Sequence, residues 1–435
     1  MRAAVGIALV AASLRLAWVL LVPNGQYSDS VWYDAAAAHL AATGEYGPSG
    51  ETGPSAWFPP GYPFFLAGIY RLFGYWQLAG KLGNVLLGAG IALLAYLLTR
   101  RLIGPRAAVV AGLLVAVWPN LVFHTGVLSS DLLATFGFLL SLWLATRTGW
   151  PTLLLLGLVI GWTVLARPVS LILLPVIGAM WWPGRLKRLA PVVAIVVVLI
   201  GAWTVRNYVR FGEVIPIATN GGYNFWQVNQ PYADGTDTYW AFVPMDDPDY
   251  QVMRYGDEFT KNREGYRYGL AFLRSHPDRF FTLIPDKIFW LWHSDTSGFY
   301  EGALYPPMQG PSAVHEWIAS HERLAESFTF RWYELFGSLA ILGAIFALAT
   351  RRLQLWPLLL LPVLLTGFHL FFHAKDRFHL PVDPFIGIMA GYALVAAQKL
   401  VPQLGQAIVS YRGAHLSQQV QHKEQVVQTS QRVGE

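Results

Sequence analysis

Cysteine is absent from the sequence, which excludes disulfide bonds and metal sites built on thiolate ligands. Charge is scarce as well: 13% of the 435 residues are Asp, Glu, Lys or Arg, against about 25% in a typical soluble domain. The sequence contains no Walker or dinucleotide-binding loop and no His-Glu-x-x-His zinc motif. We therefore expect no direct use of ATP or a soluble nucleotide sugar. Nucleic acid is not an expected partner either, because the basic residues gather in short loops between apolar runs.

Long apolar runs are what the sequence has in place of charge. Hydrophobic residues make up 54% of it, and many runs approach the ~20 residues that a helix needs to cross a bilayer. We predict an all-α polytopic membrane protein with about ten transmembrane helices. The predicted spans are 3–22, 78–99, 107–125, 129–146, 152–167, 169–183, 190–208, 333–350, 354–373 and 380–397. The first run is too long for a signal peptide and has no cleavage site after it, so we expect a retained helix.

The loops between these runs differ in charge, which predicts the orientation of the chain. One set of loops carries basic residues: Arg100, Arg101, Arg106, Arg147, Arg185, Lys187, Arg188, Arg351 and Arg352. The alternate loops are acidic, because loop 23–61 has no Lys or Arg and segment 209–332 has more acidic than basic residues. The acidic residues of loop 23–61 are Asp29, Asp34, Glu45 and Glu51. Since Lys-rich and Arg-rich loops stay in the cytoplasm, we predict a multi-pass inner (plasma) membrane protein with an extracytoplasmic active site.

These predictions divide the chain into four parts. An N-terminal transmembrane module, 1–208, contains the first exterior loop, 23–61, and an extracytoplasmic domain spans 209–332. C-terminal transmembrane helices follow at 333–397, and a cytoplasmic tail ends the chain at 398–435. We expect the tail to be poorly ordered, because it is rich in Gln and has no periodic apolar face.

Two carboxylates, Asp29 and Asp34, lie in the first exterior loop. Ser28 or Asp29 could simply cap a short helix, since Ser and Asp are preferred at that position. Alternatively, one of the two acids is a general base that takes a proton from an acceptor hydroxyl at the membrane surface. Five residues apart on a helix, they point about 140° away from each other, so we do not expect a close carboxylate pair.

Asp131 begins the fourth predicted span on the same face of the membrane. An acid in the first turn of a helix is stabilised by the helix dipole, which by itself could account for this residue. A second acid on that face could also orient the acceptor or help to hold a cation. A divalent metal therefore stays open as a cofactor, with its ligands unknown.

Cations on the predicted exterior face are our choice for a phosphate-binding site: Arg206, Lys375 and Arg377. Arg binds phosphate oxygens in a planar fork, and topology does not call for cations on this face. The alternative is that these residues anchor lipid headgroups or pair with Asp376. Arg15 lies inside the first span, where it either snorkels to the interface or is a functional cation.

Short motifs spread over about residues 10–395 carry a family resemblance. They are Asp29-x-x-x-Tyr33 with Gly44, Pro60-Gly61-Tyr62-Pro63, Leu128-Ser129-Ser130-Asp131, Ala166-Arg167-Pro168, Arg206-Asn207-Tyr208 and Arg377-Phe378-His379-Leu380-Pro381. In this order they resemble the GT-C class of membrane glycosyltransferases. More narrowly, they resemble the bacterial branch of glycosyltransferase family 39, related to protein O-mannosyltransferases and the lipid A aminoarabinose transferase. The resemblance implies a GT-C fold and inverting transfer of a sugar from a polyprenyl-phosphate donor to a hydroxyl on a protein, lipid or glycan.

The resemblance also implies roles for single residues. Asp29 matches the first-loop catalytic acid by its spacing to Tyr33, and Asp131 resembles the second catalytic acid. We add Tyr33, Asp34 and Arg15 as candidate supporting residues.

The first loop also departs from the pattern of the aminoarabinose transferase. Ser30 follows Asp29 where a second acid is expected, and Trp32 stands where that enzyme has a cation. No Lys precedes the first-loop prolines. These departures argue against aminoarabinose transfer and leave the sugar open.

Two rival functions remain at this point. A transporter or flippase of lipid-linked sugars usually has charged or broken helices near the midplane and repeated halves. Here Arg15 is the one clear charge inside a predicted span, and no internal repeat is evident. The third interpretation is a non-catalytic partner in a cell-envelope complex. Our prediction is the glycosyltransferase, with Asp29 as the base.

Overall fold

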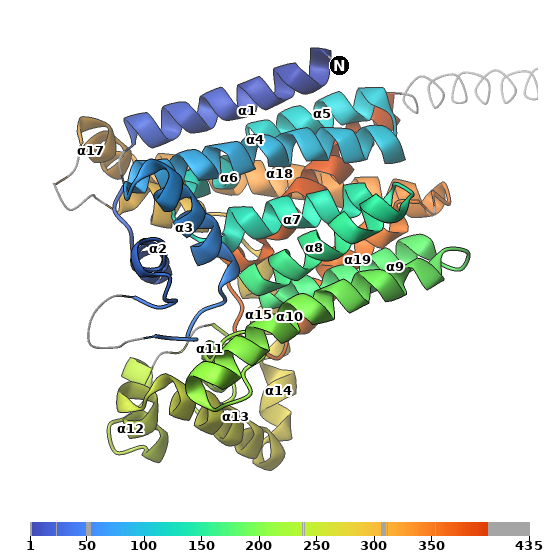
Figure 1. The fold of residues 1–435 in the computed structure, drawn as a ribbon. Helices are drawn as coiled ribbons and strands as arrows, with labels where there is room; N and C mark the ends of the chain where they lie inside the picture. The colour runs from blue at the N-terminus through green and yellow to red at the C-terminus, as the bar shows by residue number, and fades with distance from the viewer. Residues whose placement is uncertain are drawn as a thin grey trace, which may run out of the picture.

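A computed structural model describes residues 2–22, 24–48, 54–236, 238, 240–305, 310, 312–352 and 354–398. Within these ranges the chain is built of helices and contains no β-strand (Figure 1). Glu51 and residues 399–435 of the predicted tail lie outside the described residues.

The predicted spans all fall on helices of the structure. In the part of the chain that the structure describes, five helical segments are long and apolar enough to cross a membrane: α1 (Arg2–Leu21), α4 (Gln77–Leu102), Leu186–Phe211 with α10 (Leu189–Phe211), α18 (Glu322–Ala349) and Asp376–Gln398. α5 (Pro105–Ala116) and α6 (Pro119–Phe123) form a sixth candidate, bent by 53° at a break. The shorter apolar helices are α7 (Ser130–Ala145), α8 (Trp150–Ala166), Pro168–Trp181 with α9 (Leu173–Trp181), and α19 (Trp356–His369). The prediction of an all-α polytopic membrane protein is confirmed.

The bundle has buried and outer helices. α4 and the segment Asp376–Gln398 are mostly buried, whereas α1, α10 and α18 bury less than a quarter of their apolar length. Because lipid is as apolar as Leu, membrane helices associate through close packing of small residues. A Cβ on Gly137 of α7 would lie 2.1 Å from Thr163 Oγ1 of α8, so only glycine permits this approach.

Loop 23–61 contains α2 (Asp29–Thr43) and a left-handed turn at Gly44 (φ 80°), and α3 (Gly61–Phe73) follows it. The Gly44 N–H donates to the Leu40 carbonyl and ends α2. Asp29 is the first residue of this short helix, and its carboxylate lies 3.4 Å from the guanidinium of Arg377.

Segment 209–332 contributes helices to two places. α11 (Asn220–Gln227), α12 (Pro248–Tyr255), α13 (Glu258–Ser275) and α14 (Pro277–Thr282) gather at one end of the bundle in Figure 1. α17 (Ala313–Ser320) lies apart from them, where its Ile318 packs in one buried cluster with Val22. α18 begins at Glu322, so a single helix runs through the predicted domain boundary at 332/333.

Candidate active site

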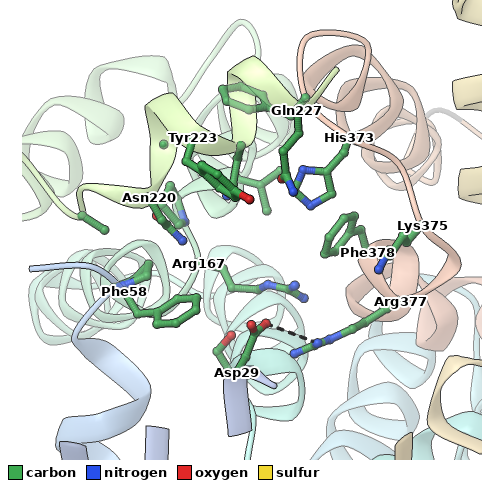
Figure 2. A pocket seen from close by; sticks show the side chains of 18 of the residues that line it. Asp29, Phe58, Arg167, Asn220, Tyr223, Gln227, His373, Lys375, Arg377 and Phe378 are labelled. Carbon is green, nitrogen blue, oxygen red and sulfur yellow. Dashed lines mark hydrogen bonds and ion pairs between the residues drawn. The ribbon is translucent and has the colours of Figure 1, made fainter. Parts of the chain in front are cut away.

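A cavity of about 980 Å³ lies where the α11–α14 helices meet the bundle. Its wall is assembled from segments far apart in the sequence: Tyr27–Asp29 with Tyr33, Trp57–Pro59, Ala166–Val169, residues around Asn220–Gln227, Glu301, and Phe368–Phe378 in part. Its volume is at the upper end of the range for ligand pockets, roughly 300–1,000 Å³. Figure 2 shows Asp29, Arg167, Lys375 and Arg377 converging from different elements on the same space.

Arg377 connects three carboxylates at the edge of this cavity. Its Nε and Nη2 atoms donate to Asp131 Oδ2 at 3.0 and 2.9 Å. Its Nη1 atom reaches Asp29 Oδ2 at 3.4 Å and Glu301 Oε1 at 3.3 Å. Asp131 therefore holds the guanidinium through two short contacts, whereas Nη1 makes only longer contacts with Asp29 and Glu301.

Asp131 lies behind the cavity wall rather than in it. Its side chain is fully buried in the first turn of α7, and both carboxylate oxygens are engaged, Oδ1 by Arg167 and Oδ2 by Arg377. Removing one partner of such a buried ion pair would leave an uncompensated charge. Asp131 thus orients two guanidinium groups that themselves line the cavity.

Asp29 is the most exposed acid of the group, with 36% of its side chain accessible. Ser28 stands at the N-cap of α2 but makes no side-chain cap hydrogen bond; its hydroxyl approaches Asp29 Oδ1 at 3.4 Å. Tyr33 lines the cavity one turn further along α2, and burial together with the Asp29 charge raises the pKa of its phenol. Tyr33 therefore stays protonated and can donate a hydrogen bond but cannot act as a base.

Three of the predicted site residues do not line the cavity: Asp34, Arg15 and Arg206. Asp34 accepts hydrogen bonds from Tyr70, Tyr75 and Gln77 and does not line the cavity, which confirms that it diverges from Asp29.

Arg15 is completely buried and donates to the Ala116 carbonyl at 2.7 Å, where the break between α5 and α6 frees backbone acceptors. The snorkelling alternative for Arg15 is therefore wrong.

Arg206 also lies outside the cavity lining. It donates to the carbonyl oxygens of Tyr46 and Ser55 at 3.4 Å, and its guanidinium lies 4.8 Å from the ring centroid of Trp203. These contacts hold loop 23–61 against α10, whereas Lys375 and Arg377 do line the cavity.

Glu301 is the residue that sequence analysis missed. It lies in the π-helical turn Tyr300–Leu304, in a segment without a motif or a charge pattern. Burial raises the pKa of its carboxyl, while the neighbouring Arg377 opposes the shift. No local signal marks Glu301, because its importance depends on its contact with Arg377, which is distant in the sequence.

Comparisons with known proteins come from sequence and from fold. Residues 58–206 match the model of a family described as dolichyl-phosphate-mannose-protein mannosyltransferase. No curated protein sequence matches the chain. Oligosaccharyltransferase AglB from Archaeoglobus fulgidus, solved with an inhibitory peptide and a dolichol-phosphate, matches with a TM-score of 0.51 and 14% identity over 93% of this chain and 52% of that one. An Archaeoglobus fulgidus oligosaccharyltransferase tethered to an acceptor peptide gives a TM-score of 0.52 and 14% identity over 91% of this chain and 50% of that one.

ArnT from Cupriavidus metallidurans bound to undecaprenyl phosphate gives a TM-score of 0.43 and 15% identity, over 93% of this chain and 80% of that one. The chain spans about half the length of the AglB chains that it matches. In sequence over residues 58–206 and in fold over most of its length, the chain is thus similar to the GT-C membrane glycosyltransferases, and the predicted resemblance is confirmed.

Proposed function

We propose that this chain is an inverting glycosyltransferase that moves a sugar from a polyprenyl-phosphate donor to a hydroxyl acceptor. The observation that carries the proposal is the contact between Asp29 and Arg377 at the wall of a large cavity in a polytopic membrane protein. The AglB structure holds a dolichol-phosphate and a peptide, which supports a lipid-linked phosphate and an acceptor as the two kinds of ligand here.

The donor phosphate binds at Arg377, with Lys375 and Arg167 beside it. All three residues line the cavity, and a guanidinium donates to phosphate oxygens with charge-assisted hydrogen bonds. Asp131 keeps two nitrogen atoms of Arg377 in place, so the third, Nη1, can exchange its long contacts of 3.3–3.4 Å for a phosphate oxygen. We no longer include Arg206 among the phosphate ligands, because its guanidinium donates to carbonyl oxygens of the first exterior loop.

Asp29 is the general base of the transfer. It accepts the proton of the acceptor hydroxyl as that oxygen forms a bond to the anomeric carbon, and the bond from this carbon to the phosphate oxygen breaks. The departing polyprenyl phosphate needs no proton, because Arg377 and its neighbours stabilise the negative charge that develops on it. A single displacement of this kind inverts the configuration of the sugar.

The carboxylates of the site do not fit a divalent metal in this arrangement. The positive charge that Asp29, Asp131 and Glu301 surround is already the Arg377 guanidinium. Asp131 has both oxygens engaged by arginines and offers none to another cation. The proposed mechanism therefore uses no metal-dependent step.

The absence of cysteine makes the proposed extracytoplasmic location directly testable. A single cysteine at Ser275, exposed at the end of α13, should react with a membrane-impermeant maleimide in intact spheroplasts. A cysteine at Thr148, exposed between α7 and α8, should react only after permeabilisation, and the unmodified chain provides a thiol-free background. The reverse labelling pattern would place the site in the cytoplasm and contradict the proposal.

Glu301 should make donor binding depend on pH. As pH falls through its raised pKa, the carboxyl loses its negative charge, so the site becomes more positive and should bind the donor phosphate more tightly. Glu301→Gln removes that charge permanently, so it should bind the donor several-fold more tightly at neutral pH and show a weaker gain on acidification. Donor affinity measured across pH tests this, with the exposed Glu45→Gln as control. Parallel pH profiles for wild type and Glu301→Gln would count against a role for Glu301.

The decisive test of the function is sugar transfer by the purified protein in detergent. A panel of polyprenyl-phosphate sugars is offered with hydroxyl acceptors, and products are identified by mass spectrometry. Transfer without a sealed bilayer supports the glycosyltransferase, whereas movement of the donor in vesicles without transfer would favour a flippase. Mass analysis of envelope glycans in a deletion strain would then identify the sugar and acceptor.

A further inference from the structure

A second cluster of acid and base side chains lies outside the cavity and has no part in the proposed transfer. It consists of Asp295, between α15 (Ile284–Trp292) and α16 (Ser297–Phe299), with His379 in η6 (Asp376–Val382) and Asp383 just after η6. All three are almost completely buried, Asp295 at 1% exposure and the other two at 0%. Their donor atoms lie within 4.8 Å of one another.

The imidazole of His379 is fixed so that one nitrogen faces both carboxylates. Its Nδ1 lies 2.6 Å from the Leu291 carbonyl oxygen, and its ring stacks between Trp292 and Tyr333 at centroid distances of 5.2 and 5.3 Å. A carbonyl can only accept, so Nδ1 carries a proton and, in the neutral ring, Nε2 presents a lone pair. That Nε2 lies 3.4 Å from Asp295 Oδ1 and 3.2 Å from Asp383 Oδ1.

The two carboxylates differ in how they are satisfied. Asp295 accepts from Trp118 Nε1 at 2.6 Å and from Asn120 Nδ2, so neighbouring donors hold its orientation. While the His379 ring is neutral, neither oxygen of Asp383 accepts a hydrogen bond from a described residue, and His379 Nε2 donates none. Two buried carboxylates need a positive charge between them. Either a second proton on the His379 ring, which is within ion-pair distance of both, or a metal ion at the same place supplies that charge.

We infer that Asp295, His379 and Asp383 bind a divalent transition-metal ion, with Zn²⁺ the best match. Zinc binds imidazole nitrogen and carboxylate oxygen at about 2.0–2.2 Å in a tetrahedron, which separates neighbouring ligand atoms by roughly 3.4 Å. The observed 3.2 and 3.4 Å agree with that separation. A ligand histidine usually donates its other N–H to a carbonyl or carboxylate, as His379 Nδ1 does here.

The ion would fasten the two segments that frame the cavity. Asp376, at the start of η6, accepts from Ser294 Oγ at 3.1 Å and from the N–H groups of Thr296 and Ser297 at 2.9 and 3.0 Å. The metal would connect the same two segments a second time. One is η6, which carries Arg377, and the other is the segment from Ser294 that leads to Glu301. Its role is structural, and it does not depend on the proposed glycosyl transfer.

Metal analysis of the tag-free, full-length protein, purified without chelator, tests this inference. After incubation with ZnCl₂ and removal of excess ion, wild type should retain about one Zn²⁺ per chain. His379→Gln and Asp383→Asn should retain less than about a tenth of that amount, because each loses one of three ligands. Asp34→Asn is the matched control, a buried aspartate outside the cluster that should keep the metal.

Wild-type protein that retains no metal would overturn the inference, as would full retention in both ligand variants. If the variants fail to fold, the zinc X-ray absorption spectrum of wild type decides. Nitrogen and oxygen scatterers with one imidazole support the site, and any other first shell refutes it. The metal content is measured without a transfer assay, so its outcome stands apart from that of the proposed function.

Discussion

Asp29→Asn is expected to lower the rate of sugar transfer by about 10²–10⁴-fold, the usual contribution of a general base. Asn has the shape of Asp but cannot take the proton of the acceptor hydroxyl. Donor binding should survive, because Arg377 keeps its two contacts with Asp131 and loses only a long contact of 3.4 Å. Initial transfer rates and donor affinity, measured on the same preparation, separate these two effects.

Glu45→Gln is the control for this variant, since Glu45 is an exposed acid of the same loop, just after α2, and pairs with Arg210 on the surface. It should transfer sugar at the wild-type rate. If Asp29→Asn also retained wild-type transfer, Asp29 could not be the base. Glu301, on the other side of Arg377 Nη1, would then be the acid to replace next.

Arg377→Lys is expected to lower kcat/KM by about 10²–10³-fold, similar to the removal of one donor that stabilises developing negative charge. Lys keeps the positive charge but has no planar fork, so it cannot hold Asp131 with two nitrogens and still direct a third at the phosphate. The loss should appear in both donor affinity and turnover. Steady-state kinetics across donor concentrations provide the measurement.

The stability of the Arg377→Lys protein must be checked in parallel, because Asp131 is fully buried and depends on its arginine partners. Thermal unfolding in detergent distinguishes a folded, inactive protein from a misfolded one. Arg210→Lys, at an exposed cation outside the cavity, serves as the matched control and should keep wild-type kinetics. Normal kcat and KM in a folded Arg377→Lys protein would exclude Arg377 as the phosphate ligand.

The helical architecture could be predicted from the sequence because membrane-length hydrophobicity is a local property. Each predicted run falls on an apolar helix, although several are shorter than a full span and one pair is bent by 53°. Turn chemistry was also readable, as at Gly44, where the left-handed conformation favours glycine. The resemblance to GT-C enzymes followed from motifs within or beside these same segments.

The candidate site was predictable only in part. One cavity is lined by Asp29, Tyr33, Lys375 and Arg377. We had grouped Arg206 with these cations because it lies at the end of a predicted span on the same predicted face of the membrane, yet it does not line the cavity. A shared membrane face does not establish distance, and Arg206 instead holds the first loop against α10. Glu301 carries no sequence signal, since its contact with Arg377 is what distinguishes it. Asp383 falls inside the predicted span 380–397, but only the structure shows that it faces His379.

Local composition and spacing were enough to show that this chain forms apolar membrane helices and that several acids and cations lie in the loops between them. Which of these charges meet is visible only in the folded chain: Asp29, Asp131 and Glu301 contact Arg377, and His379 lies between Asp295 and Asp383. The physical reason is that burial of an apolar run adds up residue by residue along the chain. Ion pairing instead depends on separations of a few ångströms between groups that can be hundreds of residues apart.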